Sequence, residues 1–157
     1  MKTKENDSIK LIPLGGVGEI GKNMYVVEVD EDIFVIDAGL MFPENEMLGI
    51  DIVIPDYSYL IQNESRVKGI FLTHGHEDHI GGLSYLLRKI NVPVYATKLT
   101  IAFAQVKMKE QDFHQKANFS TLDLLHQVNT SLHIILAGLL FQFLLQPKLS
   151  DDHLQTF

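Results

Sequence analysis

His74-Gly75-His76-Glu77-Asp78-His79 is the stretch that decides the fold, because it gathers three histidines and two carboxylates within six residues. The apolar run before it, residues 69–73, has the length and composition of a short buried strand. After it, apolar residues recur at helical spacing at Ile80, Leu83, Leu87 and Ile90. The sequence therefore predicts a tight turn between the carboxyl end of a strand and a helix, with potential ligands on that turn.

The side chains of this turn suit a metal site. Imidazole nitrogen and carboxylate oxygen are donors that zinc and similar divalent ions accept. His74 and His76 can close on one ion, while Asp78 and His79 reach a second. Two neighbouring ions can hold a bridging hydroxide and stabilise the attacking and leaving oxygens of a phosphodiester. A solvated polar turn is the alternative, but four ligand-type side chains in six positions favour metal. Glu77 is expected to point away from the ions.

The surrounding chain predicts short strands and one further helix. Strands are expected at residues 11–14, 24–29, 33–36 and 92–96, and Asp30-Glu31-Asp32 joins the second to the third as a hairpin. Pro93 indicates an edge strand or the start of a strand. Thr97 is a suitable N-cap for a helix that runs to about Glu110. Residues 40–66 are expected to form a long loop with short apolar pieces.

Composition separates two regions and excludes several classes of protein. Residues 1–117 hold 12 of the 13 Lys and Arg and 17 of the 20 Asp and Glu, whereas residues 118–157 are rich in leucine. The net charge of −7 argues against a broad basic surface that binds nucleic acid by charge alone. The absence of cysteine excludes a disulfide scaffold and Cys-based zinc fingers. With a polar N-terminus and no apolar stretch of about 20 residues, we expect a cytoplasmic protein without a membrane partner.

A glycine-rich stretch at residues 16–21 fits the G-x-G-x-x-G pattern of dinucleotide-binding proteins, and Asp37 lies at a suitable distance along the chain to bind a ribose. That fingerprint requires a helix that begins at the glycines. Residues 24–36 predict a hairpin instead, so we expect no dinucleotide.

Several motifs occur in a defined order along the chain. They are Leu14-Gly15-Gly16-Val17-Gly18-Glu19-Ile20-Gly21-Lys22-Asn23, Ile36-Asp37-Ala38-Gly39 followed by Phe42-Pro43-Glu44, Leu48-Gly49-Ile50-Asp51 with Ile54-Pro55-Asp56-Tyr57, and the histidine motif after Thr73. Together they resemble the bacterial ribonuclease J family, a β-CASP group of the metallo-β-lactamase fold. The resemblance runs from about residue 11 to about residue 116.

The resemblance implies a fold and a set of site residues. The fold is α/β: the N-terminal half of an αββα sandwich, with one mixed sheet and helices on one face. His74 and His76 would bind one Zn²⁺, Asp78 and His79 a second, and Asp37 would lie beside the site and help to orient it. Mn²⁺ is an alternative ion. In some members the loop that matches Leu48 and Ile50 holds a structural Ca²⁺ through backbone carbonyls.

The resemblance also implies an activity and partners. The family hydrolyses RNA as a 5′-to-3′ exonuclease and endonuclease in RNA processing and decay, including rRNA processing. Its members are homo-oligomers, and an RNA-degradation complex is a further expected partner.

The match to the family is partial. The family's later ligands, a His in a Thr-Thr-His-Ser-Ile-Pro-like motif, a bridging Asp in a Thr-Gly-Asp-like motif and a late His, are not found after residue 116, nor is a β-CASP domain. We interpret residues 1–117 as the N-terminal part of the domain. Residues 118–157 are interpreted as a divergent tail, such as a frameshift or gene disruption would produce; a genuine helical cap is the alternative.

For this chain alone we expect little or no ribonuclease activity, because four ligands of seven would hold two ions weakly. Two other functions stay open. One is another hydrolase of the same fold, such as a thioesterase, and the other is a non-catalytic truncated module.

Overall fold

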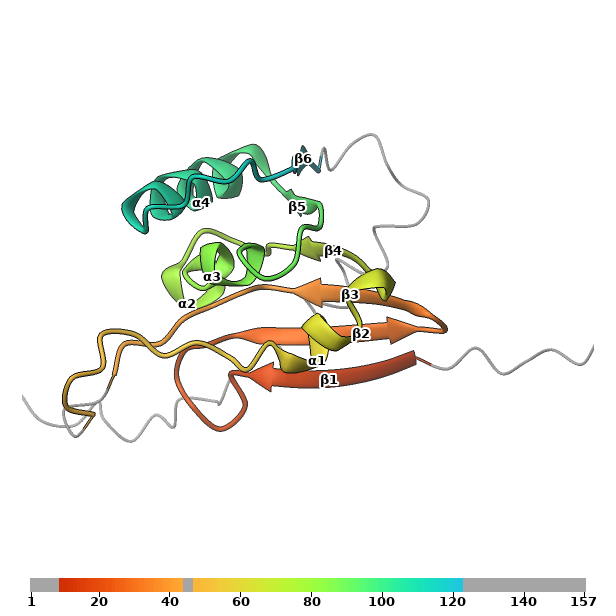
Figure 1. Ribbon diagram of the computed structural model, residues 1–157, viewed down its shortest axis with the longest axis horizontal. Coiled ribbons are helices and arrows are strands. Elements are labelled where there is room, and N and C mark those ends of the chain that lie inside the picture. Colours follow the sequence, from red (N-terminus) through yellow and green to blue (C-terminus); the bar gives the residue numbers. More distant parts are fainter. Residues whose placement is uncertain (1–8, 44–46, 123–157) are drawn as a thin grey trace, which may run out of the picture.

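The structure is a computed structural model that describes residues 9–43 and 47–122. Its centre is one six-stranded sheet in which the strands follow each other in chain order (Figure 1). The strands are β1 (Ile9–Gly15), β2 (Met24–Val29), β3 (Asp32–Ile36), β4 (Val67–Phe71), β5 (Val94–Ala96) and β6 (Phe119–Thr121). The first three form an antiparallel meander, and β4, β5 and β6 continue in parallel with β3. The predicted mixed sheet is therefore confirmed.

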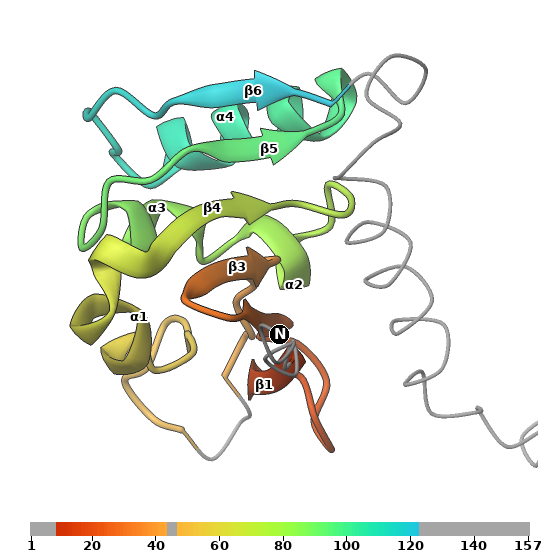
Figure 2. The same cartoon turned by 90° about the vertical axis from the view of Figure 1, so that its right-hand side faces the viewer.

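Short helices connect the parallel strands and pack against one face of the sheet (Figure 2). They are α1 (Ser58–Gln62), the 3-10 helix η1 (Glu64–Arg66), α2 (Glu77–Ile80), α3 (Leu83–Leu87) and α4 (Lys98–Glu110). None of the helices in the described part of the chain combines the length and the hydropathy that a membrane span requires.

The core lies between this face and the helices. Val26, Val35, Ile70 and Val94 pair in register across four neighbouring strands, and all four are fully buried. Fully buried residues of the helices complete the same cluster, namely Leu60, Leu83, Leu86 and Ala104. Burying an aliphatic side chain of this size stabilises a fold by about 1.5–3 kcal/mol. This core fixes the carboxyl ends of β3 and β4 side by side, where the histidine motif begins.

Two predicted elements are wrong, each for a local reason. The helix expected over residues 80–90 is broken into α2 and α3 at Gly81 and Gly82, where the Gly82 amide donates to the carbonyl of Ala38 in another segment at 2.8 Å instead of continuing the helix. A Cβ at Gly82 would lie 2.5 Å from the carbonyl oxygen of Gly39. Residues 40–66 are not all loop, since they contain α1 and η1. Tyr57, just before α1, donates its hydroxyl to the carbonyl of Gly82 at 3.1 Å and so ties α1 to the site.

Other local predictions are confirmed. The hairpin between β2 and β3 turns at Asp30 and Glu31. Pro93 stands before β5, which is an inner strand and not an edge, because β6 lies beyond it. The Thr97 side chain accepts a hydrogen bond from the Thr100 amide at 3.3 Å and caps α4, which ends at Glu110.

The sheet continues past residue 117, where the composition changes. β6 pairs with β5, and the amide of Leu122 donates to the carbonyl of Ala96 at 2.8 Å. Residues 123–157, which are most of the stretch interpreted as tail or cap, lie outside the described residues. The boundary between residues 117 and 118 therefore stays a prediction.

Candidate metal centre

The histidine motif is held by a second segment of backbone that follows β3. Residues 37–40 run beside residues 77–82, with hydrogen bonds from the Ala38 amide to the His79 carbonyl at 2.8 Å and from the Gly82 amide to the Ala38 carbonyl at 2.8 Å. Gly39 permits this approach, because a Cβ there would lie 1.7 Å from the carbonyl oxygen of Asp78. The Asp37-Ala38-Gly39 segment after β3 thus packs directly against the histidine motif and holds it through backbone hydrogen bonds.

Asp37 lies directly beside His79. Both side chains are almost completely buried, and Asp37 Oδ2 is 2.7 Å from His79 Nδ1. Asp37 Oδ1 accepts from the Thr73 amide at 2.8 Å, and the Thr73 hydroxyl contacts the same carboxylate. Because an ionised carboxylate only accepts hydrogen bonds, Nδ1 carries the proton in this contact and Nε2 presents its lone pair. The backbone of Asp37 has a φ of 61°, a strained conformation of the kind that occurs at functional sites.

His79 Nε2 and the carboxylate of Asp78 face the same point. His79 Nε2 is 3.4 Å from Asp78 Oδ2. Two ligands of one tetrahedral ion, each bonded at about 2.0–2.2 Å, lie about this far apart. The Asn23 amide nitrogen is 2.9 Å from Asp78 Oδ2 and 3.2 Å from His79 Nε2, so it supplies the partial positive charge that a cation would supply. The donor chemistry of this pair fits a divalent ion.

His74 and His76 complete the cluster. The ring centroids of His74 and His76 are 4.5 Å apart, and those of His74 and His79 are 4.1 Å apart. The Thr73 hydroxyl lies 3.0 Å from His74 Nδ1. Burial, together with the neighbouring His79, lowers the pKa of His74 below its usual value, which favours the neutral ring that a metal ligand needs.

The structure brings together all four predicted ligands and Asp37, but their donor atoms do not converge on one point. Among residues 9–43 and 47–122, no group of three or more His, Cys, Asp or Glu side chains is arranged to hold a metal ion. The hydrogen bonds to Thr73 and Asn23 occupy part of the donor set. The ligand assignment therefore stays a prediction that rests on these contacts and on the chemistry of the side chains.

Helix α4 covers one side of the motif. The ring of Phe103 packs on Gly75, where an added Cβ would lie 2.6 Å from it. Lys107 forms an ion pair with Glu77, and this contact raises the pKa of Lys107. Glu77 therefore faces α4, in agreement with the expectation that it points away from the ions.

Sequence reasoning missed two polar residues of the site and one helix contact. Asn23 and Thr73 were visible only as parts of motifs, and their roles depend on contacts across 55 and 36 residues of sequence. Phe103 was expected only as one residue of the helix that follows Thr97, and no contact with the motif was predicted for it.

The loop expected to hold calcium contains Leu48, which is 90% exposed, and Ile50, which is 50% exposed. The calcium site stays a prediction. The glycines at 16–21 lie in a loop between β1 and β2, without the helix that a dinucleotide requires.

Comparison with known proteins places this chain in a family. Residues 17–147 match the family model of the metallo-beta-lactamase superfamily. The chain belongs to the metallo-β-lactamase superfamily. Membership implies metal binding, and it confirms the predicted fold class.

This metallo-β-lactamase-type chain is also similar to named ribonucleases. It is 62% identical, over 75% of its length, to ribonuclease J2 of Bacillus subtilis (strain 168), of which it covers 21%. It is 58% identical, over 76% of its length, to ribonuclease J 2 of Staphylococcus aureus (strain NCTC 8325 / PS 47), of which it covers 22%. The chain thus spans about a fifth of the length of these relatives. The resemblance to ribonuclease J that the motifs indicate is confirmed.

Solved structures show more distant similarity. The short form of human tRNase Z is 17% identical, with a TM-score of 0.44, over 72% of this chain and 42% of that chain.

Proposed function

We propose that this chain supplies the first metal-binding segment of an RNA-hydrolysing enzyme of the ribonuclease J type, with 5′-to-3′ exonuclease and endonuclease activity. The observation that carries the proposal is the 62% identity to ribonuclease J2 of Bacillus subtilis, together with the buried Asp37–His79 contact that orients one predicted ligand. The enzyme would act on RNA in the cytoplasm. Homo-oligomerisation and membership of an RNA-degradation complex belong to the same proposal.

Within this proposal, His74 and His76 hold one Zn²⁺, and Asp78 and His79 hold a second; Mn²⁺ is the alternative. The bound ions would supply an activated water and offset the charge that develops on the phosphate. The protein's own task is orientation. Asp37 keeps the His79 ring in the tautomer that presents Nε2, and Thr73 anchors both Asp37 and His74. A structural Ca²⁺ bound through the carbonyls of Leu48 and Ile50 is a further part of the proposal.

Because the chain spans about a fifth of its relatives, the proposal is tested in a chimera. Residues 1–118 of this chain replace the matching segment of the Bacillus subtilis relative, and hydrolysis of a 5′-monophosphorylated RNA is measured against the intact relative. We expect metal-dependent hydrolysis at a rate within about tenfold of the relative, and its loss in the His76→Ala chimera. The His114→Ala chimera is the matched control, since His114 is exposed and lies outside the motif.

The chimera also separates this proposal from the two other functions. A folded chimera that hydrolyses a glutathione thioester but not RNA would assign the segment to a thioesterase-like hydrolase. A folded chimera without either activity, made from an active relative, would leave the segment as a non-catalytic module. Both results would overturn the proposed function.

A further inference from the structure

A second concave site lies away from the histidine motif. It is a pocket of about 600 Å³ at the amino ends of β5 and β6 and beside α4. The motif follows the carboxyl end of β4, and β4, β5 and β6 are parallel, so the two sites lie at opposite edges of the sheet. The volume falls within the range of about 300–1,000 Å³ that is typical of small-molecule sites.

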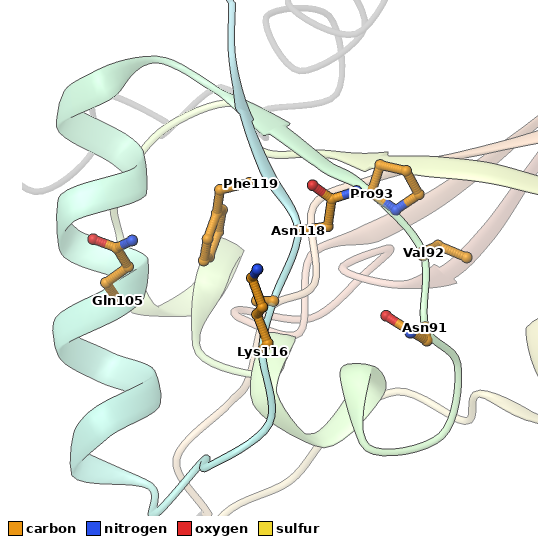
Figure 3. A pocket seen from close by; sticks show the side chains of 8 residues that line it. Asn91, Val92, Pro93, Gln105, Lys116, Asn118 and Phe119 are labelled. Atoms are coloured by element: carbon orange, nitrogen blue, oxygen red, sulfur yellow. The ribbon is translucent and has the colours of Figure 1, made fainter.

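The pocket has an unusual lining for a chain with a net charge of −7. Its eight residues include three carboxamides, one ammonium group and no carboxylate: Asn91, Gln105, Asn118 and Lys116 are joined by Val92, Pro93, Ala117 and Phe119. Figure 3 shows Gln105 projecting from α4 on one side, Lys116 and Phe119 in the middle, and Asn91 and Val92 on the other side. The polar groups therefore come from three separate segments and surround a shared space.

The polar side chains of this pocket have no partners within the part of the chain that the structure describes. None of Asn91, Gln105, Asn118 and Lys116 forms a side-chain hydrogen bond or ion pair with another described residue. Phe119 is partly buried; it packs on the core and also lines the pocket. The pocket thus offers four solvent-exposed polar side chains that no other described residue binds, beside an aromatic ring that also packs on the core.

We propose that this pocket binds one nucleotide, with its base near Phe119 and the carboxamides and its phosphate at Lys116. Carboxamides pair with base edges, and adenine in particular presents a donor and an acceptor that match one carboxamide. Aromatic side chains supply a surface on which bases stack, and a lysine ammonium neutralises a phosphate. The nucleotide is either free or part of an RNA strand; only the RNA source rests on the proposed function.

The test is a titration of the ¹⁵N-labelled 157-residue chain with AMP, followed by amide and carboxamide NMR shifts. EDTA is present throughout, so the histidine motif holds no metal and failure here is separate from failure of the proposed function. We expect shifts at Gln105, Lys116 and Asn118. Lys116→Gln should weaken AMP binding by about 3- to 10-fold through loss of the charged contact, and Gln105→Ala should weaken it as well. Lys109→Gln, an exposed lysine of α4 outside the pocket, is the matched control and should leave AMP binding unchanged.

Three probes separate the outcomes. Absence of shifts at these residues up to about 10 mM AMP would overturn the proposal. Shifts of equal size with ribose 5-phosphate would also overturn it, because they would show an anion site that does not recognise a base. A short oligoadenylate that binds at the same residues at least about tenfold more tightly than AMP identifies an RNA strand as the source; equal affinity identifies a free nucleotide.

Discussion

Replacement of Asp37 by asparagine is the sharpest test of how the candidate metal centre is oriented. Asparagine keeps the size of the side chain and tolerates the left-handed backbone that a φ of 61° requires. Its oxygen can still accept from the Thr73 amide, but its NH₂ group then faces His79 Nδ1, which lies 2.7 Å from the carboxylate in the native chain. An NH₂ group donates, so the ring must switch tautomer and place its proton on Nε2. The metal-facing nitrogen then has no lone pair to offer.

The magnitude follows from this single contact. Loss of an orienting partner behind a metal-bound histidine lowers metal affinity by about 10- to 100-fold, and loss of a charged hydrogen bond in a buried pair destabilises the fold by about 2 kcal/mol. Zinc affinity is measured by isothermal titration, the tautomer by ¹⁵N shifts of the His79 ring, and stability by urea unfolding in EDTA. Asp32→Asn is the matched control, because Asp32 begins the same strand but is about half exposed and pairs with Lys68. An Asp37→Asn chain with native zinc affinity and a native tautomer would refute the reasoning.

Three further predictions concern the scaffold around the site. The hydrogen bond from Tyr59, with Lys10 and Arg66 nearby, holds the pKa of Glu28 below its usual value. The ionised Glu28 carboxylate therefore contributes fully to the free energy of unfolding above the unfolded pKa of about 4.3, and this contribution is lost as pH falls through the folded pKa. Urea unfolding of Glu28→Gln should accordingly show a weaker loss of stability below pH 5 than the native chain. Gly39→Ala should destabilise the fold by about 3 kcal/mol or more, because the added Cβ meets the fixed carbonyl of Asp78. Gly75→Ala should destabilise it by only about 1 kcal/mol, because the half-exposed Phe103 ring can move. Equal urea-unfolding midpoints for the two variants would contradict this. Thr97→Ala removes the cap of α4 and should cost about 1 kcal/mol in the same assay.

The parts of the fold that depend on local signals could be predicted from the sequence. The β2–β3 hairpin follows from β-branched runs around an acidic turn, and α4 follows from its Thr97 cap. The break between α2 and α3 could not be predicted, because the spacing of Ile80, Leu83 and Leu87 is continuous. It arises from the passage of residues 38–40 beside Gly81 and Gly82, a contact between distant segments.

The candidate site shows the same division between local and distant information. The ligand types and their spacing are written in six consecutive residues, so the cluster could be predicted directly. The identity of the groups that orient it could be predicted only for Asp37, and only through a family resemblance. Asn23 and Thr73 act through hydrogen bonds to Asp78, His79 and Asp37 that no periodicity reveals.

Zinc titration of the 157-residue chain and its histidine variants tests the central claim most directly. We predict that the native chain binds Zn²⁺ and that the combined His74→Ala and His76→Ala variant loses at least about tenfold in affinity or one equivalent of metal. The His114→Ala chain should bind Zn²⁺ as the native chain does. Zinc binding that survives the double variant at native affinity and stoichiometry would contradict the assignment of the metal centre to this motif.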